Sequence, residues 1–209
     1  MKNFASEVYG KLRERYGVPP VALHFSNTLE LLIATMLSAQ CTDKRVNIVT
    51  ETLFQKYKTA NDYATSINLA DDIKSVNFFR NKALHIKATA QILVEQYGGE
   101  VPDAMDGLLK LPGVARKTAN VVLVTGFNKI EGIVVDTHVR RISNRLGLSK
   151  EDNALKIERD LMSCFEREVW SKIPNLFIAL GRDVCTARSP HCELCILSSI
   201  CPSSRSKSA

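Results

Sequence analysis

The sequence has no long hydrophobic run, and it lacks the marks of a secreted or membrane-spanning protein. No segment reaches the roughly 18 consecutive apolar residues expected of a membrane-spanning helix. The start, Met1 to Phe4, leads directly into charged residues and offers no apolar core for a secretion signal. We therefore expect a cytoplasmic protein without a membrane partner.

Two further patterns are absent from the chain. There is no glycine-rich nucleotide-binding loop, and no internal repeat with a period of roughly 20 to 50 residues. With 45% hydrophobic and 24% charged residues the sequence is not that of a wholly disordered protein. Its 209 residues are sufficient for one large or two small domains.

The charge balance is basic. Lys and Arg number 28 against 22 Asp and Glu, which gives a formal charge of +6 and a pI near 9.0. Such a balance favours an anionic partner, either a nucleic acid or an anionic membrane surface.

Apolar residues recur at helical spacing along most of the chain, which predicts an all-α fold. The recurring sets are Phe4, Val8 and Leu12; Val46, Val49 and Leu53; Leu84, Ala88 and Ile92; Val139, Ile142 and Leu146; and Ile173, Phe177 and Leu180. Asn27 followed by Glu30 predicts a capping box at the start of a helix. Gly147 and Gly181 stand where we expect helices to end.

The segment 108–124 predicts two helices joined by a tight hairpin. Pro112 and Gly113 interrupt the helical pattern, which resumes at Val114. Backbone N–H groups at the start of the second helix can hold a phosphate of DNA without reading the bases. A turn between two helices with no ligand is the alternative that these residues leave open.

Four of the six cysteines lie close together near the end of the chain, in the pattern Cys185-x6-Cys192-x2-Cys195-x5-Cys201. In a reducing compartment such a cluster indicates a metal site rather than disulfides. The spacing alone fits either tetrahedral zinc or a four-iron, four-sulfur (4Fe-4S) cluster.

The hairpin block 111–120 and the cysteine spacing together resemble endonuclease III, a family of helix-hairpin-helix DNA glycosylases that carry an iron-sulfur cluster. The resemblance extends from about Asn27 to Cys201. It implies a 4Fe-4S cluster on the four cysteines. It also implies two helical domains: residues 21–130 form a six-helix domain with the hairpin, and residues 1–20 join 131–209 in a cluster domain.

The resemblance further implies a function in DNA repair. The expected substrate is double-stranded DNA with damaged pyrimidines or abasic sites, and the expected reaction is base removal followed by strand cleavage through a Schiff base. Lys117 stands at the position of the family's nucleophile. Asp136 lies in a matching Val-Asp-Thr-His motif after a short apolar run. By itself Asp136 predicts only a helix N-cap; the resemblance places it opposite Lys117 across a cleft.

Two residues are candidates for entering the DNA stack. Gln40 matches the family's residue that fills the space of a flipped nucleotide, and Phe78 lies in a matching wedge loop. The alternatives are an ordinary helix end for Gln40 and a core position for both Phe78 and Phe79. Asn77 replaces a frequent glycine of the family, a change that asparagine tolerates at positive φ.

The remaining expected DNA contacts come from the hairpin, the aspartate motif and the cluster loop. They are Leu111, Gly113, Ala115, Arg116, His138 and Arg188. Ala115 replaces a second glycine of the family's hairpin, and Arg188 is alone as a basic residue between Cys185 and Cys192.

Three other functions remain possible at this point. The chain could be a monofunctional mismatch glycosylase of the same superfamily, a non-catalytic iron-sulfur DNA-binding module, or a zinc-stabilised protein. Lys117 and Asp136 together favour the bifunctional enzyme. We expect a monomer that acts in the cytoplasm, associated with the nucleoid if the source is prokaryotic.

Overall fold

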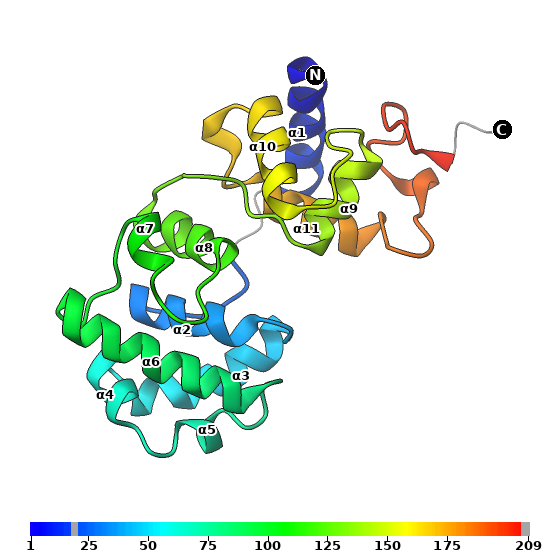
Figure 1. The fold of residues 1–209 in the computed structure, drawn as a ribbon. Coiled ribbons are helices and arrows are strands. Elements are labelled where there is room, and N and C mark those ends of the chain that lie inside the picture. Colours follow the sequence, from blue (N-terminus) through cyan, green and yellow to red (C-terminus); the bar gives the residue numbers. More distant parts are fainter. Residues whose placement is uncertain (18–20, 206–209) are drawn as a thin grey trace. The chain divides into compact units, whose positions relative to one another are not determined.

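The computed structural model describes residues 1–17 and 21–205, and within these ranges every regular element is a helix (Figure 1). The predicted all-α class is confirmed. The chain divides into two compact units. The first combines Met1–Pro20 with Gly132–Ala209, and the second is the continuous segment Val21–Glu131.

The continuous unit is built around one largely buried helix, α2 (Thr28–Ser38). The unit's other helices are α3 (Asp43–Lys56), α4 (Ala60–Thr65), α5 (Leu69–Asp72), α6 (Phe79–Tyr97), α7 (Met105–Leu108) and α8 (Arg116–Phe127). Every residue of α2 from Leu31 to Leu37 is buried, because α3, α6 and α8 all pack against this helix. A helix that is buried on all sides, as α2 is from Leu31 to Leu37, forms the core of such a bundle.

The discontinuous unit joins both ends of the chain. Its helices are α1 (Lys2–Tyr16), α9 (Thr137–Arg145), α10 (Ala154–Cys164) and α11 (Ile173–Asp183), with single 3-10 turns at Arg167–Val169 and Cys192–Leu194. Helix α11 packs against α1 and α9. The N-terminal helix contributes Leu12 to the same core as Ile142 and Phe177, so the unit requires both ends of the chain.

The start of α2 differs in one detail from the predicted capping box. The Asn27 side chain accepts from the Glu30 backbone N–H at 2.9 Å, as expected. The Glu30 carboxylate accepts from the N–H of Ser26, at 2.6 Å, one residue before the cap. Two donors are therefore satisfied at this helix start, although the second is not the one that the motif specifies.

Gly181 does not end a helix, as its position in the sequence suggested, but lies inside α11. A Cβ atom at this position would approach the His138 ring and the Arg141 guanidinium to 2.7 Å. The glycine thus permits close packing of α11 on α9. Gly147 does follow the end of α9, with a left-handed φ of 69°.

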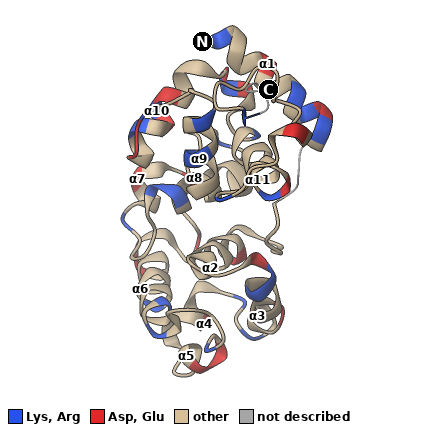
Figure 2. Cartoon of the chain, turned by 90° about the vertical axis from the view of Figure 1, so that its right-hand side faces the viewer, with Lys and Arg blue, Asp and Glu red and all other residues tan. Residues whose placement is uncertain are grey.

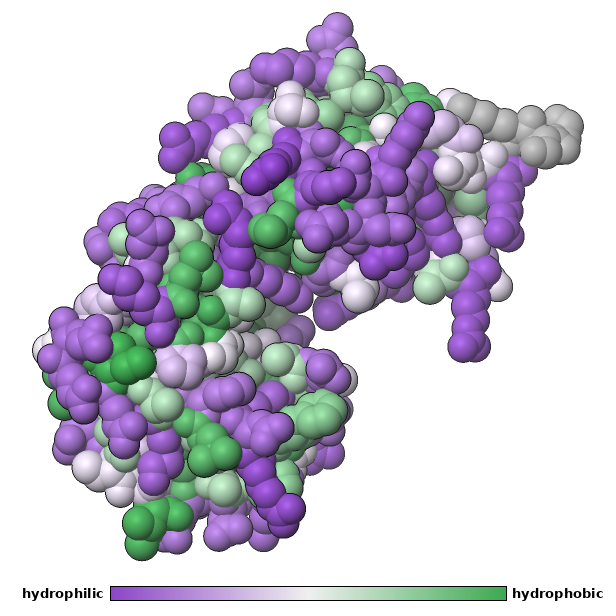
Figure 3. All heavy atoms as spheres, viewed as in Figure 1, coloured by the Kyte–Doolittle hydropathy of each residue, from purple (hydrophilic) through white to green (hydrophobic). Residues whose placement is uncertain are grey.

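Hydrophilic residues cover most of the face of each unit that is drawn in Figure 3. No helix in residues 1–17 and 21–205 is both long and apolar enough to cross a membrane.

Candidate nucleic-acid and cluster sites

The predicted hairpin connects α7 to α8 and is fixed to α6. Gly113 adopts a left-handed φ of 79°, which L side chains rarely do. The Thr89 hydroxyl of α6 donates to the Pro112 carbonyl at 2.8 Å. Leu111 is buried, so only its backbone can contact a ligand, whereas Gly113 and Ala115 are exposed.

Gly113 lies directly against α6. A Cβ atom there would meet the Cβ of His85 at 2.9 Å, in addition to the strain of a positive φ. We expect Gly113→Ala to lower the free energy of unfolding by about 1 to 3 kcal/mol and to weaken binding to undamaged duplex DNA. Thermal unfolding and fluorescence anisotropy measure the two effects. The matched control is Gly10→Ala in the middle of α1, where a Cβ meets nothing within 4 Å; a loss of stability in this control as large as in Gly113→Ala would contradict the explanation.

Lys117 is the second residue of α8 and its side chain is exposed. The helix begins after Ala115, whose methyl group provides no capping hydrogen bond. The backbone N–H groups of this first turn and the positive end of the helix dipole favour an anion such as a phosphate there. Helix α8 begins with two basic residues, Arg116 and Lys117. Figure 2 shows the Lys and Arg residues of the chain in blue.

Asp136 is the N-cap of α9, as the sequence predicted. Its carboxylate accepts from the Val139 N–H at 2.8 Å, and the side chain is only partly exposed. The preceding connector is anchored by the fully buried Ile133. Asp136 belongs to the discontinuous unit, and Lys117 belongs to the continuous one.

One face of α9 carries the polar side chains of His138, Arg141 and Arg145, and the two arginines bind backbone carbonyls of α11 and of the cysteine segment. His138 and Arg141 are partly buried, and a guanidinium nitrogen of Arg141 lies 3.2 Å from the His138 Nδ1. The same guanidinium donates to the Gly181 and Cys185 carbonyls, each at 3.2 Å. Arg141 therefore holds the His138 ring in place, two residues after the N-cap Asp136.

The four clustered cysteines line one cavity of about 220 Å³. None of them forms a disulfide. Burial raises the pKa of the Cys195 thiol, and the neighbouring thiols of Cys185, Cys201 and Cys192 raise it further, against a lowering by the Leu197 backbone. Among the described residues no three such side chains are grouped closely enough to hold a single metal ion. Four cysteines that line one cavity are the donor set of a larger, cationic iron-sulfur core, which binds thiolates and offsets their mutual repulsion.

Arg145, at the end of α9, fixes the beginning of the cysteine segment. Its guanidinium donates to the carbonyls of Thr186 at 2.7 Å and Ala187 at 2.9 Å. The same group lies 3.2 Å from the Cys185 Sγ. The Cys201 Sγ lies 3.7 Å from the Arg145 carbonyl. One residue therefore contacts both the first and the last cysteine of the cavity.

We expect Arg145→Met to loosen this segment. Hydrogen bonds from a charged donor to several carbonyls are lost, which corresponds to about 1.5 to 3 kcal/mol. The visible absorbance of the bound cluster should decay faster in the presence of an iron chelator. Arg140→Met is the control, because Arg140 forms an exposed ion pair with Asp152, and such pairs contribute little to stability. Equal decay in the two variants would contradict the role given to Arg145.

Gln40 and Phe78 both lie in exposed turns of the continuous unit. Gln40 follows the end of α2 with φ 54°, and Phe78 precedes α6 with φ 57°. The Phe78 side chain is 60% exposed, so the alternative that places it in the core is wrong; only Phe79 packs partly against the core. Asn77 has no positive φ. Arg188 is exposed on the loop between Cys185 and Cys192.

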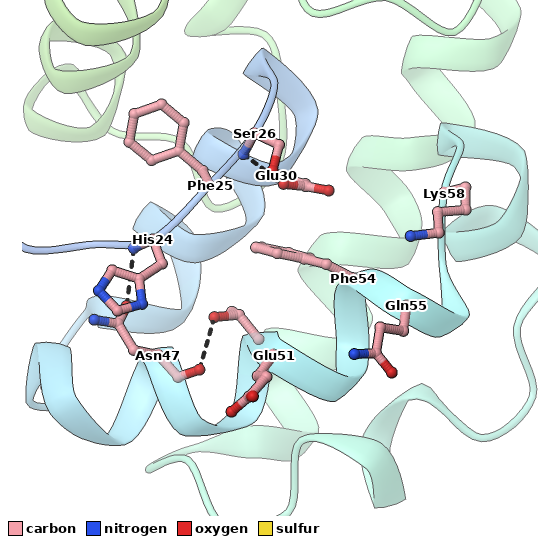
Figure 4. Close-up of a pocket in the computed structure, with 10 residues that line it drawn as sticks. His24, Phe25, Ser26, Glu30, Asn47, Glu51, Phe54, Gln55 and Lys58 are labelled. Atoms are coloured by element: carbon pink, nitrogen blue, oxygen red, sulfur yellow. Dashed lines mark hydrogen bonds between the residues drawn. The ribbon is translucent and has the colours of Figure 1, made fainter.

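A larger cavity of about 480 Å³ opens between the start of α2 and α3 (Figure 4). Its lining residues are His24, Phe25, Ser26, Glu30, Asn47, Thr50, Glu51, Phe54, Gln55 and Lys58. None of them is among the predicted site residues. The Asn47 side chain accepts from the His24 N–H at 3.0 Å and donates to the Ala22 carbonyl at 2.8 Å, so it holds the chain that leads into α2.

The sequence alone did not identify Arg141 and Arg145 as residues that support the cysteine segment. It also did not identify Lys82, whose ammonium group donates to the carbonyls of Leu37 and Ala39 next to Gln40. The spacing of His138, Arg141 and Arg145 does place them on one helical face, a signal that could have pointed to the two arginines. Lys82 is buried in the structure. Nothing in its local sequence indicates that.

Two models of known protein families match the chain, one over the segment that contains the hairpin and one over the cysteine segment. Residues 33–167 match the model of the HhH-GPD superfamily of base excision DNA repair proteins, and residues 185–201 match the iron-sulfur binding domain of endonuclease III. The chain is 46% identical to endonuclease III of Synechocystis sp. over 98% of its length and 94% of the relative's. It is 50% identical to endonuclease III of Bacillus subtilis, over 84% of this chain and 81% of that one.

A solved structure extends the likeness to the whole fold. It is a trapped covalent intermediate of endonuclease III with DNA, in an estranged-adenine complex. The two chains share 40% identity and a TM-score of 0.93, with 100% of this chain and 99% of the other covered. The second matched model makes the cysteine segment an iron-sulfur domain, not a zinc site. The protein belongs to the endonuclease III family of iron-sulfur base excision DNA repair proteins.

Proposed function

We propose that this protein removes oxidised pyrimidines from double-stranded DNA and then cleaves the strand at the abasic site. Membership of the endonuclease III family makes it a DNA glycosylase and abasic-site lyase with a 4Fe-4S cluster. The observation that carries the proposal is an exposed lysine, Lys117, in the first turn of a helix that follows a Gly113 hairpin. A related chain has been trapped covalently on DNA.

Lys117 is the nucleophile in this proposal. Its neutral amine attacks C1′ of the damaged nucleotide, the glycosidic bond breaks, and the base leaves with the electron pair of that bond. Loss of the amine proton and opening of the sugar ring give an imine between Nζ and C1′. The imine acidifies C2′–H, and removal of that proton expels the 3′ phosphate. A hydroxyl nucleophile could not form the imine, which is why the lyase step requires an amine.

Asp136 stabilises the positive charge that develops on the sugar as the base leaves. The Val139 N–H donates to its carboxylate at 2.8 Å and holds it at the N-terminal end of α9. As a base it also accepts a proton during the steps that follow. We propose that Lys117 and Asp136 act on the same nucleotide from the two units, so that neither unit alone is active.

The DNA contacts divide into two kinds. The backbone at Leu111, Gly113 and Ala115, together with Arg116, holds phosphates without sequence preference. Gln40 and Phe78 act at the lesion: the amide occupies the space of the extruded nucleotide, and the aromatic ring enters the base stack. His138 and Arg188 contact the backbone from the discontinuous unit.

The cluster would be held by Cys185, Cys192, Cys195 and Cys201. When bound, it crosslinks the segment that carries Arg188 and thereby fixes it for contact with DNA. Arg145 and Arg141 connect this segment to the helix that Asp136 caps. The cluster and the carboxylate are therefore supported by one helix, α9.

Incubation with a duplex that contains one oxidised pyrimidine tests the proposed activity. Chromatography measures the released base, and a denaturing gel without alkali measures strand cleavage. We expect both products, and neither from the undamaged duplex. Base release with cleavage only after alkali would indicate a monofunctional glycosylase, and neither product across several oxidised pyrimidines would indicate a binding module.

We propose that the enzyme acts as a monomer in the cytoplasm, on the nucleoid of a bacterium such as those in which its relatives occur.

A further inference from the structure

Three exposed non-glycine residues of the continuous unit adopt the left-handed backbone region that such residues rarely occupy. Asn128, with φ 53°, follows the end of α8 and is of a type that tolerates this conformation. The other two are Gln40, with φ 54°, and Phe78, with φ 57° and ψ 30°. For an L residue this conformation costs about 1 to 2 kcal/mol relative to the right-handed region. Such strain persists only where the surrounding structure enforces it, and it gathers at functional sites.

A buried lysine supplies the enforcing contacts. Lys82 lies in the first turn of α6 and is only 8% exposed. Its ammonium group donates to the carbonyls of Leu37 and Ala39, each at 2.6 Å. These carbonyls lie at the end of α2, where helix carbonyls have no partner within the helix and where the dipole favours a cation.

The Phe78 turn leads directly into the helix that carries this lysine, and the backbone bond that begins α6 joins the two. The Lys82 backbone N–H donates to the Phe78 carbonyl at 3.0 Å. Asn77, the residue before Phe78, donates from its side chain to the Gln40 carbonyl at 2.7 Å. Three hydrogen bonds thus run from the Phe78 turn and its helix to the carbonyls of the Gln40 turn.

Every backbone carbonyl from Leu37 to Gln40 accepts a hydrogen bond. Between the two carbonyls bound by Lys82, the Ser38 carbonyl accepts from the Cys41 N–H at 3.0 Å. The four carbonyls from Leu37 to Gln40 are therefore all occupied, three of them by Asn77 or Lys82. Burial lowers the pKa of Lys82, and the nearby Cys41 opposes that change. A buried cation without its two carbonyls would be strongly unfavourable, so the contact holds its geometry tightly.

We propose that Lys82 is a positioning residue that couples the Gln40 turn to the Phe78 turn, so that both side chains enter a DNA duplex in one fixed arrangement. Asn77 completes the coupling. The inference rests on the proposed function, because it takes Gln40 and Phe78 as the residues that open the duplex. It assigns Lys82 no contact with DNA and no part in the chemistry at C1′.

The test compares two substrates that differ in their need for base extrusion. The first is a duplex with one oxidised pyrimidine, on which single-turnover base excision is measured. The second is a single strand with a preformed abasic site, on which borohydride trapping at Lys117 is measured. The arrangement of Gln40 and Phe78 affects only the reaction on the duplex, because the abasic single strand has no stacked base to extrude.

Lys82→Met preserves the length of the side chain and removes its donors. We expect excision from the duplex to fall by about 10- to 100-fold, because small misplacements have effects of this order, while trapping on the abasic strand stays within about twofold of the native protein. Lys82→Arg, which retains a cationic donor, should recover part of the lost excision. Lys87→Met on the same helix is the control and should leave both assays unchanged.

Two outcomes would overturn the proposal: native excision by Lys82→Met, or an equal loss in both assays, which would indicate a general structural role. If Lys82→Met does not fold, Asn77→Ala provides the test, since Asn77 is exposed and its replacement removes the bond to the Gln40 carbonyl. The same selective loss in excision is expected, and its absence counts against the coupling. Failure of the proposed function is recognised separately, because the native protein would then excise no base at all.

Discussion

Replacement of Lys117 by alanine abolishes strand cleavage at an abasic site. The amine is the atom that forms the imine, and no neighbouring side chain can replace it at the same position. Removal of a covalent nucleophile reduces turnover by roughly 10⁴-fold or more. Single-turnover gel assays on an oxidised-pyrimidine duplex and on an abasic duplex measure the loss.

Two matched variants separate the nucleophile from its charge. Lys117→Arg keeps a cation for binding DNA but cannot form a Schiff base, so it should bind duplex DNA as the native protein does and cleave none. Lys110→Ala removes another exposed lysine, just before the hairpin. It should retain strand cleavage. Cleavage by Lys117→Arg at the native rate would show that another group attacks C1′.

The second large effect is expected from Asp136→Asn. Asparagine is as good an N-cap as aspartate, so the hydrogen bond to Val139 N–H and the start of α9 are preserved. Only the negative charge is lost. Removal of one group that stabilises developing charge reduces turnover by about 10² to 10³-fold, which we expect in single-turnover base excision.

The variant Asp136→Ala separates the two roles of the carboxylate. It removes the charge and the cap together. Its free energy of unfolding should therefore fall by about 1 kcal/mol, while its rate of base excision should match that of Asp136→Asn. If Asp136→Asn retained native excision and only Asp136→Ala lost it, the residue would act as a helix cap alone.

Much of the fold follows from local features of the sequence. Helical periodicity and capping residues such as Asn27 and Asp136 specify where helices lie and start, because both depend on residues within one or two turns. The hairpin was readable for the same reason, since Gly113 permits a backbone conformation that few residues adopt. The cysteine spacing likewise lies within one short segment.

Contacts between distant segments could not be read in this way. Lys82 binds the Leu37 carbonyl across 45 positions, and Arg145 reaches Cys185 across 40. A lysine or arginine in an amphipathic helix is exposed by default, so only the packed structure identifies it as buried. The position of Gly181 inside α11 could not be predicted for the same reason, because its role depends on the approach of α9 and not on its own helix.

The most direct test of the central claim is the identification of the residue that becomes attached to DNA. The native protein is incubated with an oxidised-pyrimidine duplex in the presence of borohydride, the adduct is digested with a protease, and the peptide that carries the nucleotide is sequenced by mass spectrometry. We predict a single adduct on Lys117, absent from Lys117→Ala. An adduct on any other residue, or base release without an adduct, would contradict the account.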